Sequence, residues 1–202
     1  MREPTRRLFF ALWPDAEERA ALAHATRKAV RSCGGRPVPE ESLHVTLAFL
    51  GSVPERRMPE LQAIARRIAH AAPEQGAPVL VSFDRVVHWA RPRILCALGD
   101  EAPGEAPGTD LPRATGHSGA SAFAEALKSE TSAAGFTPDL KPFHAHVTVA
   151  RKVAHARSAP FLRPILWRFD AFALIESRTD SKGPVYSVIE SYLLVKEEKA
   201  HE

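Results

Sequence analysis

Residues 43–51 read LHVTLAFLG and residues 144–151 read HAHVTVAR, so His-Val-Thr followed by an aliphatic residue occurs twice. The histidines of the two copies, His44 and His146, are 102 positions apart in a chain of 202 residues. Chance predicts about 0.2 instances of His-x-Thr-hydrophobic in a chain of this composition. Both copies lie in runs of β-branched and apolar residues that are typical of strands. The repeat therefore indicates two related functional motifs, each carried by a strand.

Within each copy the histidine and the threonine are two residues apart. Because alternate residues of a strand point to the same side of a sheet, His44 shares a face with Thr46, and His146 shares a face with Thr148. Imidazole titrates near pH 6.5, so one neutral ring can accept a proton while a protonated ring donates one. Two threonine hydroxyls can donate hydrogen bonds to the non-bridging oxygens of a phosphate. If the two halves of the chain meet, this set supports phosphate-ester chemistry by acid–base catalysis without a metal.

The remaining sequence predicts a mixed α+β fold, with too few helices for a doubly wound sheet. Helices are expected from a capping box at Asp15 and Glu18 to about Ser32, from residue 54 to 72 with Ser52 and Glu55 as capping pair, and over 123–134. Strands are expected over residues 8–13, 43–50, 78–89, 93–99, 147–151, 166–177 and 185–195. Residues 100–121 contain seven glycines and prolines. They predict a flexible loop, either a tolerated surface insertion or a flap over a substrate, and residues 196–202 predict a charged tail.

Composition excludes several classes of protein. With 45% hydrophobic and 25% charged residues, the chain resembles neither disordered nor fibrous sequences. Cys33 and Cys96 are far apart and belong to no CxxC or Cys/His cluster, so we expect buried free thiols. The run at residues 8–13 is too short for a signal peptide, and no segment approaches the ~20 apolar residues of a membrane span. We expect a cytoplasmic protein, and its net charge of +3 permits an anionic partner without requiring one.

The two histidine motifs, the opening RLFFALW (residues 7–13) and the closing LIESRTDSKGPVYSVIESYLL (residues 174–194) resemble the 2H phosphoesterase superfamily. Within it, the chain is most similar to the bacterial and archaeal RNA 2′,3′-cyclic phosphodiesterases, historically called 2′-5′ RNA ligases. The resemblance covers nearly the whole chain apart from residues 100–121 and the tail. It implies a single domain over residues 1–202 with two pseudo-symmetric lobes. Two antiparallel sheets would face each other across a central cleft, with helices outside and one motif from each lobe.

The resemblance also implies roles for particular residues. They are His44 and His146 as catalytic histidines, Thr46, Thr148 and Arg151 as phosphate-binding residues, and Phe49 as a platform for stacking a base. Strict strand alternation complicates two of these roles. It would turn Arg151 away from His146, unless the strand ends or twists there, and it would group Phe49 with Leu47 in the core.

The reaction implied is hydrolysis of an RNA 2′,3′-cyclic phosphate to a 2′-phosphomonoester, with His146 activating water and His44 protonating the departing 3′ oxygen. By microscopic reversibility the same site could join RNA ends, as a secondary 2′-5′ ligase activity. No cofactor or metal is implied. The expected partners are RNA ends or small cyclic nucleotides, with no membrane, and we expect a monomer.

Three alternatives remain open from the sequence. The chain could be an RNA-binding module without turnover, although such a protein would be expected to lose a motif histidine or threonine, and all four are present. It could act on another small cyclic nucleotide. Finally, His144 and His146 on one strand face, with His44, could bind zinc. No carboxylate is positioned near either motif, and the threonines would then go unexplained.

Overall fold

The computed structural model describes residues 3–71, 78–101, 119–181 and 183–194. Most of the loop expected at 100–121 and all of the charged tail at 196–202 lie outside these residues. At the margins of that expected loop, residues 100 and 101 continue a strand, and residues 120 and 121 already belong to a helix. In the described part, no helix is long and apolar enough to cross a membrane.

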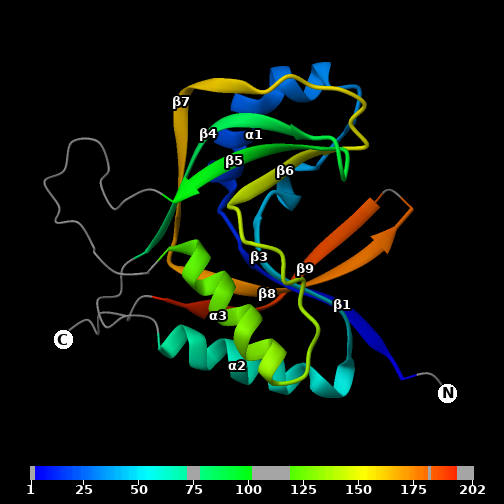
Figure 1. Ribbon diagram of the computed structural model, residues 1–202, viewed down its shortest axis with the longest axis vertical. Coiled ribbons are helices and arrows are strands. Elements are labelled where there is room, and N and C mark those ends of the chain that lie inside the picture. Colours follow the sequence, from blue (N-terminus) through cyan, green and yellow to red (C-terminus); the bar gives the residue numbers. More distant parts are fainter. Residues whose placement is uncertain (1–2, 72–77, 102–118, 182, 195–202) are drawn as a thin grey trace, which may run out of the picture.

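Among the described residues, helices are interleaved with strands up to residue 133, and four consecutive strands follow (Figure 1). In order, the elements are β1 (Thr5–Leu12), α1 (Ala16–Ser32), β2 (Arg36–Pro37), η1 (Glu40–Ser42), β3 (Val45–Pro54), η2 (Glu55–Arg57), α2 (Met58–His70), β4 (Val79–Trp89), β5 (Ile94–Glu101), α3 (Ala120–Ala133), β6 (His146–Arg151), β7 (Ala159–Phe169), β8 (Ala171–Asp180) and β9 (Gly183–Leu193).

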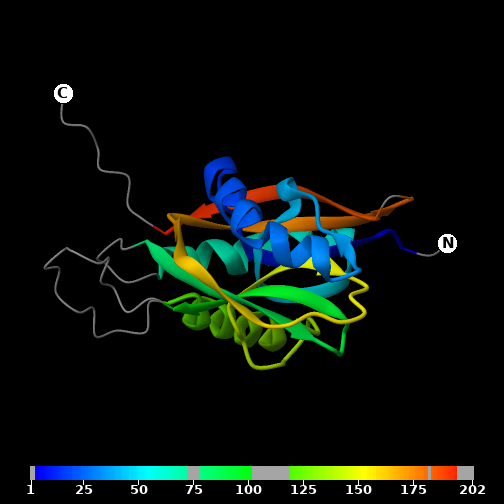
Figure 2. The ribbon, with the colours of Figure 1, turned by 90° about the horizontal axis from the view of Figure 1, so that it is seen from above.

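The strands form two sheets whose pairings are all antiparallel. The first sheet has the order β3-β1-β8-β9 and the second has the order β2-β6-β5-β4-β7. Seen from above, β8 and β9 lie in one layer while β4 and β5 lie in another (Figure 2). This architecture confirms the α+β class with two antiparallel sheets and three α-helices.

The three α-helices pack on sheet faces that the site does not use. On α1, the carbonyl of Glu18 accepts a hydrogen bond of 2.8 Å from the indole of Trp167 in β7. Gln62 and Arg66 of α2 both donate to Glu190 of β9, and α3 contacts β3 and α2. The second sheet therefore carries α1, and the first carries α2 and α3.

From residue 8 to 12, strand β1 is buried on both faces, which explains the continuous apolar sequence there. Leu8, Phe10 and Leu12 belong to the main core. Phe9 and Ala11 point the other way, into a smaller apolar cluster with Ala173 and Ile175 of β8. The candidate site described below lies against this smaller cluster, since the ring of Phe9 contacts that of His44.

Local signals predicted the ends of α1 correctly. Glu18 N–H donates to Asp15 Oδ1 at 2.8 Å, and Asp15 N–H donates to Glu18 Oε2 at 3.1 Å, so the expected capping box is present. Beyond the helix, Gly34 has a φ of +63°, a conformation that glycine adopts without strain.

The expected start of the second helix is wrong. Ser52 and Glu55 form no capping pair, because β3 continues to Pro54 in register with β1 and is followed by η2. Helix α2 begins after Arg57 without a side-chain cap, and Pro59 lies in its first turn, where a missing N–H costs little.

The strand expected over residues 166–177 is also wrong, because it is two strands in different sheets. Strand β7 ends at Phe169 in the second sheet, and β8 begins at Ala171 in the first. Between them, the carbonyl of Asp170 accepts a hydrogen bond from Leu194 N–H, and its carboxylate pairs with Arg168. The chain changes sheets at this single polar residue. The two-residue strand β2 was not expected, since so short a strand has no periodicity to detect.

Candidate active site

The two motifs lie at the starts of strands in different sheets. His44 immediately precedes β3 at the edge of the first sheet, and His146 is the first residue of β6 in the second. His44 Nδ1 lies 2.7 Å from the carbonyl oxygen of Ser42, and His146 Nδ1 lies 2.7 Å from that of His144. Because a carbonyl only accepts hydrogen bonds, each Nδ1 carries a proton, and each Nε2 is the nitrogen left for chemistry.

Each motif is followed by a β-bulge. Opposite β1, Thr46 pairs with Ala11 and Ala48 pairs with Phe10, so Leu47 is the extra residue. In β6, Thr148 pairs with Cys96 and Ala150 pairs with Leu95, so Val149 is the extra residue. A bulge adds one residue to one strand and shifts the alternation of the side chains that follow.

These bulges place Phe49 and Arg151 on the same face as the histidines. Each of them lies five positions after its motif histidine. The ring of Phe49 packs against the apolar cluster of Phe9 and Ala11, not with the core residue Leu47. The expectation from strict alternation, that Arg151 and Phe49 point away from the histidines, is therefore wrong. Their orientation is compatible with a role in the site.

Aromatic rings surround the imidazole of His44. The ring of Trp13 stacks on it at a centroid distance of 5.4 Å and 24°. Phe9 lies 5.0 Å away, and Tyr186 presents its edge at 5.1 Å. Arg19 of α1 packs on the Trp13 ring, with its guanidinium carbon 4.8 Å from the ring centroid. Its Nε also donates a hydrogen bond to the carbonyl of Leu43. The orientation of His44 is thus set by packing as well as by its Nδ1 hydrogen bond.

His146 has a more open environment. Its ring contacts that of Trp89 at a centroid distance of 4.7 Å. On the neighbouring strand, Cys96 interacts with the hydroxyl of Thr148, and burial raises the pKa of the Cys96 thiol to about 12. The thiol is therefore protonated at neutral pH and is not a nucleophile. As expected, both cysteines are buried and free.

Residues of the two sheets meet at this site. Arg151 of β6 extends a guanidinium nitrogen to 3.4 Å from the hydroxyl of Tyr186 on β9. The pKa of His44 is lowered to about 4, mainly by burial and further by the positive charges of Arg151 and Arg19. Burial also lowers the pKa of His146. Both imidazoles are therefore neutral at pH 7 when the site holds no phosphate.

Three aromatic residues of the site were not identified from the sequence: Trp13, Trp89 and Tyr186. Trp13 and Tyr186 lie within the segments that carry the family resemblance, but neither has a motif of its own. Their proximity to the histidines depends on pairings between strands far apart in sequence, which only the fold determines.

The structure does not assemble the zinc site considered above. Among the described residues, no group of three histidine, cysteine, aspartate or glutamate side chains is arranged to hold a metal ion. His144 directs its carbonyl to His146, and its side chain is exposed.

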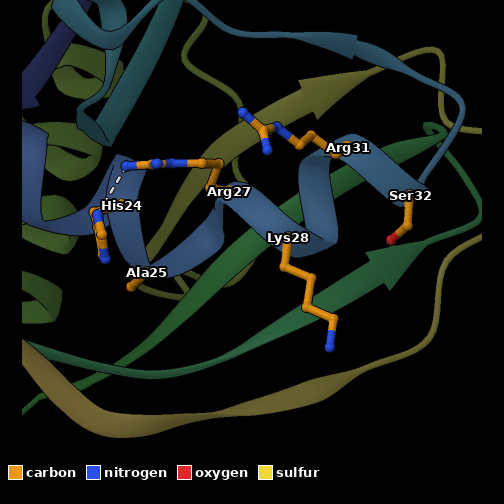
Figure 3. A pocket seen from close by; sticks show the side chains of 6 residues that line it. All are labelled: His24, Ala25, Arg27, Lys28, Arg31 and Ser32. Carbon is orange, nitrogen blue, oxygen red and sulfur yellow. Dashed lines mark hydrogen bonds between the residues drawn. The ribbon is translucent and has the colours of Figure 1, made fainter.

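A separate hollow lies along α1 and includes none of the motif residues. This groove of about 410 Å³ is lined by His24, Ala25, Arg27, Lys28, Arg31 and Ser32 (Figure 3). Arg27 donates to the ring of His24 at 2.8 Å. Its lining contains no acidic residue, so this surface is strongly basic.

Comparison with known proteins agrees with the fold. The family model described as LigT like phosphoesterase matches residues 12–96. The RNA 2′,3′-cyclic phosphodiesterase of Thermus thermophilus is 32% identical over 209 residues, covering 93% of this chain and 90% of the relative. The Escherichia coli protein of the same name is 32% identical over 160 residues, 79% of each chain. The crystal structure of E. coli LigT complexed with 3′-AMP has a TM-score of 0.76 and 27% identity over 96% of this chain and 100% of that one.

The two sheets, with a His-x-Thr motif at the start of one strand in each, define a phosphoesterase of the two-histidine type. The chain belongs to the LigT-like phosphoesterase family. It is accordingly an enzyme, a hydrolase of phosphate esters.

Proposed function

We propose that this phosphoesterase hydrolyses the 2′,3′-cyclic phosphate at RNA ends to a 2′-phosphomonoester. The observation that carries the proposal is the shared geometry of the motifs, in which both histidines donate Nδ1–H to the carbonyl two residues earlier and leave Nε2 free. Two relatives named RNA 2′,3′-cyclic phosphodiesterase support the substrate class. Crystal structures of E. coli LigT complexed with 3′-AMP and with phosphate support a nucleotide phosphate as ligand.

In the proposed reaction, one neutral imidazole takes a proton from water as the water oxygen bonds to phosphorus. The bond from phosphorus to the 3′ oxygen breaks, and the other imidazole, protonated at Nε2, gives that oxygen its proton. The hydroxyls of Thr46 and Thr148 donate hydrogen bonds to the non-bridging oxygens, where charge builds up in the transition state. Arg151 adds a positive charge and a planar donor set. Phe49, on the same face, offers an aromatic platform for the terminal base.

The family resemblance makes His146 the base and His44 the acid. With a pKa lowered to about 4, the ring of His44 is neutral in the free protein at pH 7, and its Nε2 carries no proton. The negative charge of a bound cyclic phosphate raises that pKa, because an opposite charge nearby favours the charged form of the ring. In this scheme, substrate binding favours the protonated form of His44, which can then act as the acid.

The proposal is tested with an RNA oligonucleotide that ends in a 2′,3′-cyclic phosphate, with and without EDTA. We expect a 2′-phosphate terminus to form equally well in both conditions. His44→Ala and His146→Ala should each remove most of the activity while the circular dichroism spectrum stays unchanged. His24→Ala, which removes an exposed histidine of α1, is the matched control.

Full activity in either motif variant would overturn the mechanism. Loss of wild-type activity in EDTA would point to a metal instead. Binding without turnover would favour the RNA-binding module, and turnover of cyclic mononucleotides alone would favour the small-nucleotide alternative.

The roles of the two histidines can be separated with a p-nitrophenyl phosphodiester, whose leaving group needs no protonation. His44→Ala should retain most of its activity on this substrate, whereas His146→Ala should not. The reverse pattern would exchange the two roles. Ligation is a secondary proposal, tested by incubating 2′,3′-cyclic and 5′-hydroxyl RNA ends together and looking for a 2′-5′ linkage.

A further inference from the structure

Four exposed cationic residues surround Arg151 at one end of the second sheet. We call Arg36, Arg91, Arg93 and Lys152 the basic rim. Arg36 of β2 is paired directly with Arg151 across the ladder, so their side chains leave the same face of the sheet. Val153 N–H donates to the carbonyl of Arg93 at 3.0 Å, and Arg93 Nε donates to the carbonyl of Val153 at 3.3 Å, which places Lys152 beside the turn that carries Arg91 and Arg93. Figure 1 shows this turn between β4 and β5 close to the end of β6.

No acidic side chain neutralises the basic rim in the described part of the chain. Many other cationic residues form ion pairs, including Arg56 with Glu3, Arg67 with Glu130 and Arg168 with Asp170. None of the ion pairs between described residues involves a rim residue or Arg151. Among the residues that the structure describes, the positive charge at this end of the site is therefore uncompensated.

The sequence shows the same asymmetry over longer segments. Residues 19–39, 85–99 and 140–169, which include the rim residues, contain 14 of the 27 lysines and arginines but none of the 24 acidic residues. Three of these cations lie away from the rim and pair with acids just outside the segments: Arg85, Lys141 and Arg168. One of these segments continues from Arg36 back along α1, where the basic groove of Figure 3 lies. A surface that carries several like charges attracts an extended anion, because separate charges can meet separate phosphates.

Two rim residues also have unusual backbone conformations. Arg93 has a φ of +66° and Lys152 a φ of +56°, and they are the non-glycine residues with positive φ in the described part of the chain. Residues other than glycine, asparagine and aspartate rarely adopt a positive φ. Residues held in this conformation are enriched at functional sites. The fold thus holds two neighbouring cations in conformations that local preference disfavours.

We propose that the basic rim binds the phosphodiester backbone of the RNA upstream of the reacting end. This inference rests on the proposed function and deepens it, because it makes a polynucleotide the preferred substrate over a cyclic mononucleotide. The terminal phosphate lies between the two His-x-Thr motifs. The preceding phosphates pass Arg151 and meet Arg36, Arg91, Arg93 and Lys152 at the edge of the second sheet.

The physical consequence is a specific dependence on salt. Each cation that neutralises a phosphate releases a counterion, which contributes about 0.7 to the slope of log K against log[salt] for single strands. Removing three rim charges should therefore reduce the slope for an oligonucleotide by about 2. It should leave the hydrolysis of a cyclic mononucleotide unchanged, because that substrate has no upstream phosphate.

The test compares the wild-type protein with Arg36→Gln/Arg91→Gln/Lys152→Gln. A control variant, Arg56→Gln/Arg67→Gln/Arg168→Gln, removes the same charge from exposed, ion-paired arginines elsewhere. kcat/KM is measured from 50 to 300 mM KCl for an eight-nucleotide RNA with a 2′,3′-cyclic phosphate end and for 2′,3′-cyclic AMP. We expect the rim variant alone to lose at least tenfold on the oligonucleotide at low salt, with the lower slope, and to match wild type on 2′,3′-cyclic AMP.

Equal losses on both substrates, or the same loss in the control variant, would overturn the proposal. If the wild type hydrolyses neither substrate, the proposed function fails, but the rim can still be tested. Fluorescence anisotropy then measures binding of the same eight-nucleotide RNA with a 3′-hydroxyl end. Weaker binding by the rim variant alone supports the rim, and equal binding by all three proteins refutes it.

Discussion

Replacing His44 by glutamine should remove a large part of the pH dependence of folding stability. The pKa of His44 is about 4 in the folded protein, against about 6.5 for an unperturbed histidine. Between pH 6.5 and pH 4 the unfolded chain therefore binds a proton at this position that the folded protein does not bind. Stability is complete above the unfolded pKa and is lost as the pH falls toward the folded one. Integrating this difference from pH 7 to pH 5 gives a loss of about 2 kcal/mol from His44 alone.

The assay is urea unfolding, followed by fluorescence, at half-unit steps from pH 7 to pH 5. The free energy of unfolding of the wild type should fall by about 2 kcal/mol more than that of His44→Gln over this range. Any constant offset from the lost ring contacts cancels, because only the change with pH is compared. His24→Gln controls for removing an exposed histidine. Parallel curves for the wild type and His44→Gln would refute the burial of a neutral imidazole at this position.

Three further predictions concern activity and local stability. The kcat/KM of the wild type should be bell-shaped with both limbs below pH 6.5, because burial lowers the pKa of both His44 and His146; an optimum above pH 7 in kcat/KM would contradict this. Arg151→Lys should lower kcat/KM about 100-fold although it keeps the charge, since lysine lacks the planar fork that contacts Tyr186 and that we propose binds the phosphate; activity close to wild type would show that charge alone suffices. Asp15→Ala should cost about 1 kcal/mol in urea unfolding through the lost cap of α1 without changing kcat/KM, and Asp15→Ser should restore most of it.

The features that sequence predicted correctly depend on neighbours along the chain. A shared face for His44 and Thr46, and for His146 and Thr148, stays a prediction, and it too needs only strand alternation over two residues. The capping box at Asp15 and Glu18 involves groups three positions apart. The α+β class follows from the order of apolar runs and amphipathic segments, which needs no knowledge of which strands pair.

Tertiary structure decided the rest, because the deciding contacts join segments far apart in sequence. The bulges at Leu47 and Val149 exist only in the register with β1 and β5, and they bring Phe49 and Arg151 to the histidine face. The passage from β7 to β8 at Asp170 is invisible in an apolar run that suits either sheet.

The surroundings of His44 show the same division. Its identity and its partner Thr46 follow from the sequence. Its low pKa depends on burial among rings from β1 and β9 and on the charge of Arg151 from the other sheet. Propensity and periodicity act within a strand, whereas register, burial and the electric field at a site arise only when strands meet.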